Sequence, residues 1–237
     1  IREVAPSRGL GDVYKRQDLT RLYETGWKMP EPFTVKAADG HTDLYGFMWK
    51  PFDFDSTRRY PIISYVYPGP QTEAIPLEFS VTAAYNVGLA QIGFVVVTFG
   101  HRGGSPMRDK WYHTFGYNNL RDYPLADDKC GIEQLADRFS FIDKSKVGIF
   151  GHSGGGFMST AALCTYPDFY TAAVSSAGNH DNNIYNQWWG ETHHGVREVK
   201  SFEKKTVKDS ITGKDTTVSV EKIKFETKIP TNIELAK

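Results

Sequence analysis

The chain has 237 residues, of which 40% are hydrophobic and 14% aromatic, and its 28 basic and 28 acidic side chains leave a formal net charge of zero. This size and composition suit one large globular domain. The balanced charge argues against a nucleic-acid partner or an anionic membrane surface, since both usually require a basic excess. The longest apolar run, residues 93–99, is far too short to span a membrane.

The only cysteines, Cys130 and Cys164, are too few for a disulfide framework, and both fall in segments with helical spacing, so we expect buried free thiols. No cysteine and histidine spacing typical of zinc sites occurs, and the sequence predicts neither a metal nor a cofactor.

Residues 1–17 have no helical or strand periodicity, and SRGLGDVYKRQ resembles a translated sequencing adapter. We expect a non-native or disordered tail there, with a flexible native tail as the alternative.

From residue 18 onward, strands alternate with helices. Alternating apolar side chains on both sides of Asp39-Gly40 predict an antiparallel hairpin, and the later strands are near-continuous apolar runs, typical of a parallel sheet covered on both faces. The pattern predicts an α/β fold with a mostly parallel sheet and helices on both faces, with too few parallel strands for an eightfold barrel. The expected elements are strands at 33–37, 44–49, 60–67, 93–99, 146–150 and 171–175, and helices at 81–90, 123–139 and 157–166.

The composition of the chain changes after about residue 196, where charged residues become frequent. Residues 198–226 are charged and alternate in polarity around the turn Thr212-Gly213-Lys214-Asp215, which predicts a solvated β-hairpin inserted into the domain. Residues 233–237 have the pattern of a helix that has only begun. We therefore expect residues 18–237 to form a partial domain that is interrupted by this hairpin.

A serine in a glycine-rich turn is the main functional signal. Gly151, Ser153 and Gly155 satisfy the pattern Gly-x-Ser-x-Gly, which is weak by itself. However, the apolar run KVGIF precedes the turn and the helical run FMSTAALC follows it, which is the context of a nucleophile elbow. The backbone N–H of Gly154 would then point at a developing oxyanion. The alternative is a glycine-rich turn that holds phosphate, but the lysine of a P-loop and the register of a dinucleotide fingerprint are both missing.

The segment GHSGGGF, residues 151–157, resembles the active-site turn of the prolyl oligopeptidase family of serine peptidases, in its dipeptidyl peptidase IV branch. The resemblance covers roughly residues 26–195. It implies an α/β-hydrolase fold and a serine-type peptidase that releases dipeptides, or tripeptides, after proline or alanine through an acyl-enzyme on Ser153. Four further segments agree with the family in order and spacing: 65–70 (YVYPGP), 93–103 (GFVVVTFGHRG), 143–149 (DKSKVGI) and 179–191 (NHDNNIYNQWWGE).

The resemblance also implies roles for individual side chains. Tyr67 matches a tyrosine that donates its hydroxyl to the oxyanion beside the Gly154 N–H; the alternative is an aromatic side chain that packs on the sheet. Tyr185 and Trp189 match aromatic side chains of the pocket for a proline-like residue, where flat rings pack well. Their alternative is ordinary core packing, and Asn182 stands where some members have a pocket tryptophan.

The partners that would activate Ser153 are not evident. A serine hydroxyl needs a histidine as base and a carboxylate to orient it, in the chain order serine, acid, histidine. The resemblance places the acid one strand later and the histidine one strand beyond that, so we expect a catalytic domain that is incomplete at its C-terminal end and inactive by itself. A replacement pair of His180 and Asp181 is the alternative. The histidines and nearby acids that follow the serine are His180, His193, His194, Asp181 and Glu191.

Three classes of function fit these observations: a serine peptidase, an esterase or other small-molecule α/β-hydrolase, and a non-catalytic binding protein on the same fold. The peptidase prediction implies a peptide substrate. The resemblance is compatible with a homodimeric parent protein in the periplasm or outside the cell, but the sequence itself gives no compartment.

Overall fold

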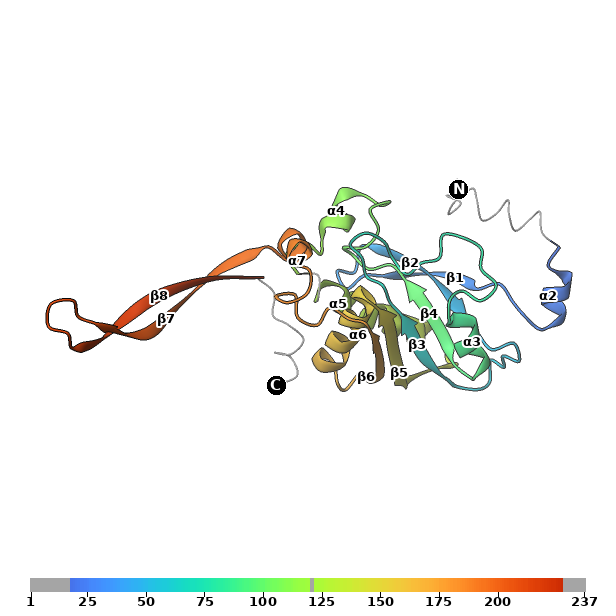
Figure 1. The fold of residues 1–237 in the computed structure, drawn as a ribbon. Coiled ribbons are helices and arrows are strands. Elements are labelled where there is room, and N and C mark those ends of the chain that lie inside the picture. Colours follow the sequence, from blue (N-terminus) through green and yellow to red (C-terminus); the bar gives the residue numbers. More distant parts are fainter. Residues whose placement is uncertain (1–17, 120–121, 228–237) are drawn as a thin grey trace.

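The structure is a computed structural model, and it describes residues 18–119 and 122–227. The expected tail at 1–17 and the expected helix start at 233–237 lie outside the described residues. A six-stranded sheet forms the body, and a separate two-stranded sheet extends away from it (Figure 1). The strands are β1 (Glu31–Lys36), β2 (Asp43–Trp49), β3 (Tyr60–Tyr65), β4 (Val95–Phe99), β5 (Ile142–His152), β6 (Tyr170–Ser176), β7 (Val196–Lys208) and β8 (Asp215–Thr227). The helices are α2 (Thr20–Glu24), α3 (Asn86–Gln91), α4 (Lys110–Thr114), α5 (Tyr123–Arg138), α6 (Gly154–Thr165) and α7 (Gln187–His194).

The sheet of the body has the strand order β1-β2-β4-β3-β5-β6. Strands β1 and β2 form the expected antiparallel hairpin, with Val35 opposite Leu44, and β2 pairs antiparallel with β4. The pairs β3–β4, β3–β5 and β5–β6 are parallel. The predicted α/β architecture, a mostly parallel sheet with an antiparallel hairpin leading in, is confirmed.

Helices cover both faces of the sheet because its central strands bury side chains on both sides. Val95 and Val97 of β4 belong to a large core beneath α5 and α6, to which Leu135 and Met158 also contribute. Val96, between them in the chain, packs in a smaller core on the opposite face, together with residues of α3. This alternation along one strand divides the hydrophobic residues into two layers.

Some details differ from the expectations. The helix expected at 81–90 begins only at Asn86, because Ala83 and Ala84 have positive φ angles of 44° and 55° and cannot continue a right-handed helix. Both cysteines are free, as expected, but they are only partly buried. Strand β6 lies at the edge of the sheet, and most of its side chains are exposed.

The second sheet is a long hairpin of β7 and β8, in 13-residue strands paired from Val196 opposite Thr227 to Lys208 opposite Asp215. It projects from the body next to α7 (Figure 1). Its large apolar side chains are exposed, including Phe202 at 70% and Phe225 at 65%. Within the described ranges, no helix has the length and apolar character to cross a bilayer.

Candidate active site

The candidate nucleophile Ser153 lies between the end of β5 and the start of α6. Its backbone has φ 55° and ψ −118°, a region that non-glycine residues rarely occupy and that typically costs about 1–3 kcal/mol. Two backbone hydrogen bonds hold the turn: the Ser153 N–H donates to the Ser176 carbonyl at 2.8 Å, and the Phe157 N–H donates to the Ser153 carbonyl at 2.9 Å. The strand, sharp turn and helix of a nucleophile elbow are therefore all present.

The glycines of the elbow permit a close approach to strand β3. A Cβ atom on either Gly151 or Gly155 would overlap the carbonyl oxygen of Val66, which directly follows β3. A Cβ on Gly155 would also lie 3.6 Å from the Cα of Tyr67. The close approach places Tyr67 beside the first turn of α6, where Gly154 is the first residue.

Tyr67 occupies a partly buried position in the turn that follows β3. Its carbonyl accepts a hydrogen bond from the Ala74 N–H at 3.1 Å, and a Cβ on Gly154 would lie 3.5 Å from the Gly69 carbonyl oxygen. Tyr65 instead stacks on Phe150 with ring centroids 4.8 Å apart. Burial, with smaller contributions from Tyr67 and Tyr85, raises the pKa of Tyr65. Of the two tyrosines, Tyr67 is thus the one that lies next to the elbow.

Tyr185 and Trp189, the predicted pocket residues, lie together. Their ring centroids are 5.9 Å apart, and the rings meet edge to face at 85°. Tyr185 is 52% exposed and Trp189 is partly buried, so this pair is not simply core packing. In the described part of the chain, no hydrogen bond or ring contact joins the pair to Ser153 or Tyr67. The neighbouring Trp188, 62% exposed, was not anticipated, although the doublet of tryptophans was visible in the sequence.

All seven histidines of the chain are among the described residues, and none is hydrogen-bonded to the Ser153 hydroxyl. The His152 Nδ1 bonds to the Ser176 hydroxyl at 2.9 Å, and the His180 Nε2 lies 3.3 Å from the Ser175 hydroxyl. Asp181 accepts a hydrogen bond from the Asn183 N–H, and within the described ranges no hydrogen bond joins its carboxylate to the His180 ring. The structure therefore gives no support to a replacement pair at these positions.

His193 and His194 belong to a different environment, since both rings pack against Trp189, with centroids 4.9 Å and 5.4 Å away. Burial, and secondarily the charge of His113, lowers the pKa of His193. Across the two described ranges, no three histidine, cysteine, aspartate or glutamate side chains form a group that could hold a metal ion.

The sequence analysis did not anticipate a buried polar network around Asp128 of α5. Asp128 is fully buried and accepts hydrogen bonds from Ser64 at 2.7 Å and Tyr170 at 2.8 Å, with the His101 Nε2 at 3.2 Å. Burial, and then the charge of Asp128, raises the pKa of Tyr170, so this phenol stays protonated as a donor. The available signal was a pair of adjacent aspartates in a helix whose spacing otherwise predicts burial.

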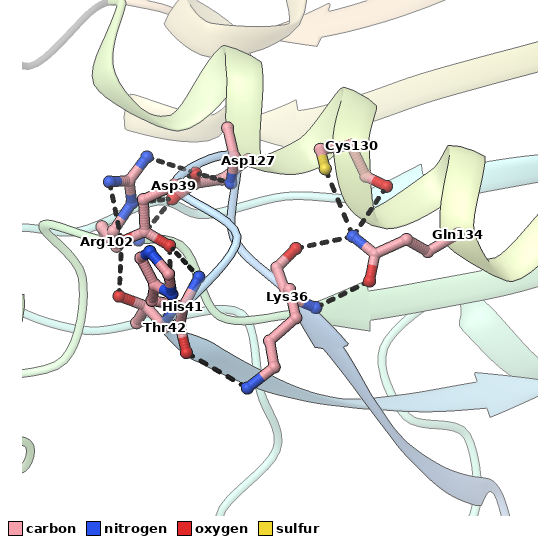
Figure 2. Close-up of polar contacts among 9 residues, drawn as sticks. Lys36, Asp39, His41, Thr42, Arg102, Asp127, Cys130 and Gln134 are labelled. Atoms are coloured by element: carbon pink, nitrogen blue, oxygen red, sulfur yellow. Dashed lines mark hydrogen bonds and ion pairs between the residues drawn. The ribbon is translucent and has the colours of Figure 1, made fainter.

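The neighbouring aspartate, Asp127, accepts hydrogen bonds from both the guanidinium and the backbone N–H of Arg102 (Figure 2). Its carboxylate is fully buried, and it also accepts a hydrogen bond from the Ala38 N–H at 2.9 Å. The Arg102 Nη1 lies 3.1 Å from Asp39 in the β1–β2 turn. This cluster joins α5, the loop after β4 and the first hairpin.

The chain is similar to known proteins in both sequence and structure. A sequence model described as the prolyl oligopeptidase family matches residues 79–211, more than half of the chain. Dipeptidyl peptidase 8 of Homo sapiens is 34% identical over 149 residues, which are 62% of this chain and 16% of that protein. The prolyl endopeptidase FAP of Mus musculus is 26% identical over 150 residues, 63% of this chain and 19% of that protein. The chain thus spans less than a fifth of the length of these curated relatives.

Solved structures show the same similarity. A candidate dipeptidyl aminopeptidase IV from Bacteroides ovatus matches with a TM-score of 0.66 and 30% identity, covering 70% of this chain and 24% of that one. Dipeptidyl peptidase 4 of Porphyromonas gingivalis also gives a TM-score of 0.66, at 23% identity, and covers 76% of this chain and 26% of that one. Together with the mixed sheet and its helices, these matches identify an α/β-hydrolase fold.

Proposed function

Because the chain belongs to the prolyl oligopeptidase family, we propose that the protein containing it is a serine peptidase with Ser153 as its nucleophile. One observation carries the proposal. Ser153 occupies a strained turn between a parallel strand and a helix, and this turn lies directly against the end of β3. A non-glycine residue held at a positive φ angle in this position is typical of a nucleophile elbow.

In the proposed reaction, the Ser153 hydroxyl attacks the scissile carbonyl and forms an acyl-enzyme. The negative charge that develops on the carbonyl oxygen is stabilised by two donors, the Gly154 N–H and the Tyr67 hydroxyl. The position of Gly154 supports its role, because the first N–H groups of a helix have no acceptor within the helix. The position of Tyr67 beside the elbow supports the second donor.

The base and its orienting acid are proposed to come from elsewhere in the protein. None of the seven histidines of this chain bonds to the Ser153 hydroxyl, and a serine without a base is a poor nucleophile. We therefore expect the 237 residues alone to be inactive. In the same account, residues 18–237 are part of one peptidase domain, and the β7–β8 hairpin is an insertion in it.

The proposed substrates are peptides that lose an N-terminal dipeptide after proline or alanine. Support comes from the names of two relatives, dipeptidyl peptidase 8 and dipeptidyl peptidase 4. The edge-to-face pair of the exposed Tyr185 and the partly buried Trp189 also supports this substrate class, because aromatic faces bind a proline ring with little polar penalty.

The experiment is hydrolysis of Gly-Pro-p-nitroanilide by the full product of the gene. We expect Ser153→Ala to lower kcat by about 10⁴-fold or more. The matched control is Ser145→Ala, at the other end of the same strand, where the hydroxyl only bonds to Asp143 at 2.7 Å. The control should retain the rate of the unmodified protein. Unchanged hydrolysis by the Ser153→Ala protein would refute the proposal.

Two further measurements test the expected inactivity of the 237-residue chain and the choice between a peptidase and an esterase. The 237-residue chain, assayed alone, should release no p-nitroaniline above background. Cleavage of p-nitrophenyl acetate without cleavage of the anilide, by the full gene product, would instead favour the esterase alternative.

A further inference from the structure

The turn that carries Tyr67 has a third attachment, which comes from a distant part of the chain. The Val66 N–H donates to the Phe150 carbonyl at 2.9 Å, and the Tyr67 carbonyl accepts from the Ala74 N–H. The next carbonyl, that of Pro68, accepts a hydrogen bond from the Tyr123 hydroxyl at 2.8 Å in a buried environment. Proline has no N–H group, so this carbonyl is the only polar backbone group with which residue 68 can be held.

The Tyr123 side chain is itself held firmly. It is only 7% exposed, and it packs against two glycines, Gly103 and Gly116, where an added Cβ would come within 2.5 Å and 2.7 Å of the ring. Burial, and then the charges of Glu73 and Asp127, raises the pKa of Tyr123, which keeps the phenol protonated as a donor.

The helix that begins at Tyr123 is anchored one turn further on by the two buried aspartates. Asp127 binds Arg102, and Asp128 binds Ser64 and Tyr170. A side chain mounted on an anchored element holds its partner more precisely than one on a free loop. The hydroxyl of Tyr123 is thus a fixed point for the turn.

We infer that Tyr123 is a positioning residue, whose bond to the Pro68 carbonyl holds Tyr67 where its hydroxyl meets the oxyanion. The inference rests on the proposed function of Tyr67. Without the Tyr123 hydroxyl, the buried Pro68 carbonyl would lose its partner, and the turn would shift to regain one. A displacement of about 1 Å in a catalytic donor can cost about 10²-fold in rate.

The test compares Tyr123→Phe with Tyr60→Phe in the full gene product. Tyr60 lies at the opposite end of β3, is 3% exposed, and its hydroxyl accepts from the Asp55 N–H at 3.0 Å. Both variants therefore lose one bond between a buried tyrosine and the backbone. We expect a similar loss of thermal stability in both. Only Tyr123→Phe should lower kcat, by about 10- to 100-fold, with KM changed by less than about twofold.

A double-mutant cycle with Tyr67→Phe separates positioning from general weakening of the fold. If Tyr123 acts through Tyr67, adding Tyr123→Phe to Tyr67→Phe should leave kcat unchanged. A further drop equal to that in the single variant would overturn the inference, as would a kcat in Tyr123→Phe no lower than in Tyr60→Phe. Full activity of Tyr67→Phe would instead refute the proposed role of Tyr67, together with the inference that depends on it.

Amide hydrogen exchange gives a readout that does not require activity. The Ala74 N–H, bonded to the Tyr67 carbonyl, should exchange faster in Tyr123→Phe and at an unchanged rate in Tyr60→Phe. Equal exchange rates in both variants would show that the turn does not depend on Tyr123.

Discussion

The turns of the β1–β2 and β7–β8 hairpins are held by the same kind of aspartate hydrogen bonds, but the strands of the two hairpins differ in what they contact. Asp39 accepts hydrogen bonds from the His41 and Thr42 N–H groups at 2.8 Å and 2.9 Å. Asp209 accepts from the N–H groups of the residues two and three positions later, at 3.0 Å and 2.7 Å. In both turns the threonine hydroxyl adds a further bond to the same aspartate. Such bonds from an aspartate side chain to nearby backbone N–H groups favour a turn whether or not the turn packs against a core.

The strands of the two hairpins differ in burial. Those of β1–β2 bury alternate side chains, including Val35 at 2% exposure and Leu44 at 0%, and Arg102 connects Asp39 to the rest of the body (Figure 2). Those of β7–β8 leave Phe202 and Ile223 at 70% and 51% exposure. The two hairpins therefore share their turn hydrogen bonds and their strand pairing, whereas the contribution of each to global stability depends on packing against a core.

The largest expected difference between the two hairpins is in apolar truncation. Leu44→Ala should lower the free energy of unfolding by about 2–5 kcal/mol, because it leaves a cavity in the core. Ile223→Ala should change it by less than about 0.5 kcal/mol, because that side chain is already largely solvated. Urea denaturation of both variants measures these values, and equal losses would contradict the account.

Removing a charged contact should also destabilise the fold more in the body than in the β7–β8 hairpin, but by less than removing an apolar side chain does. Asp127→Asn should cost roughly 2–3 kcal/mol, because it leaves the Arg102 guanidinium without its buried partner. Glu221→Gln removes a pair with Lys200 at 3.0 Å whose side chains are 43% and 56% exposed, and should cost less than about 0.5 kcal/mol. A large loss from Glu221→Gln, measured by the same denaturation, would show that the hairpin contributes to the stability of the body.

The smallest expected difference is in pH dependence. Burial opposes ionisation of Asp39, but hydrogen bonds from Thr42 and His41 and the Arg102 charge outweigh it and hold the pKa well below its usual range. Hydrogen bonds from Thr212 and Ile211 also lower the pKa of Asp209. A carboxyl whose pKa is lower in the folded state stabilises the fold above its unfolded pKa, about 4, and this stabilisation is lost as the pH falls.

Asp39→Asn should therefore reduce the loss of unfolding free energy between about pH 5 and pH 2. Asp209→Asn should leave that profile unchanged, because its turn lies on the projecting hairpin, away from the core. Unfolding curves at several pH values test both variants, and identical profiles for Asp39→Asn and the unmodified chain would contradict the expectation.

The sequence predicted the elements whose pattern reports directly on burial. The alternation around Asp39-Gly40 and the apolar runs that became β3, β4 and β5 identified the hairpin and the parallel strands. The elbow context at Ser153 was equally readable, because a glycine-rich turn between a strand and a helix is a local pattern.

Features that depend on contacts between distant segments were not readable. The helix start near Ala83 and Ala84 depends on positive φ angles that alanine does not signal. The partners of Asp127 and Asp128 come from other elements, as does the bond from Tyr123 to Pro68, which spans 55 positions in the sequence. No periodicity within a single segment encodes such pairs.

The central claim, that Ser153 is the nucleophile, is tested most directly by covalent labelling of the full gene product with diisopropyl fluorophosphate. Mass spectrometry of the digested protein should show a single adduct, on the peptide that contains Ser153, and no adduct in Ser153→Ala. An adduct on another serine, or equal labelling of the Ser153→Ala protein, would contradict the account.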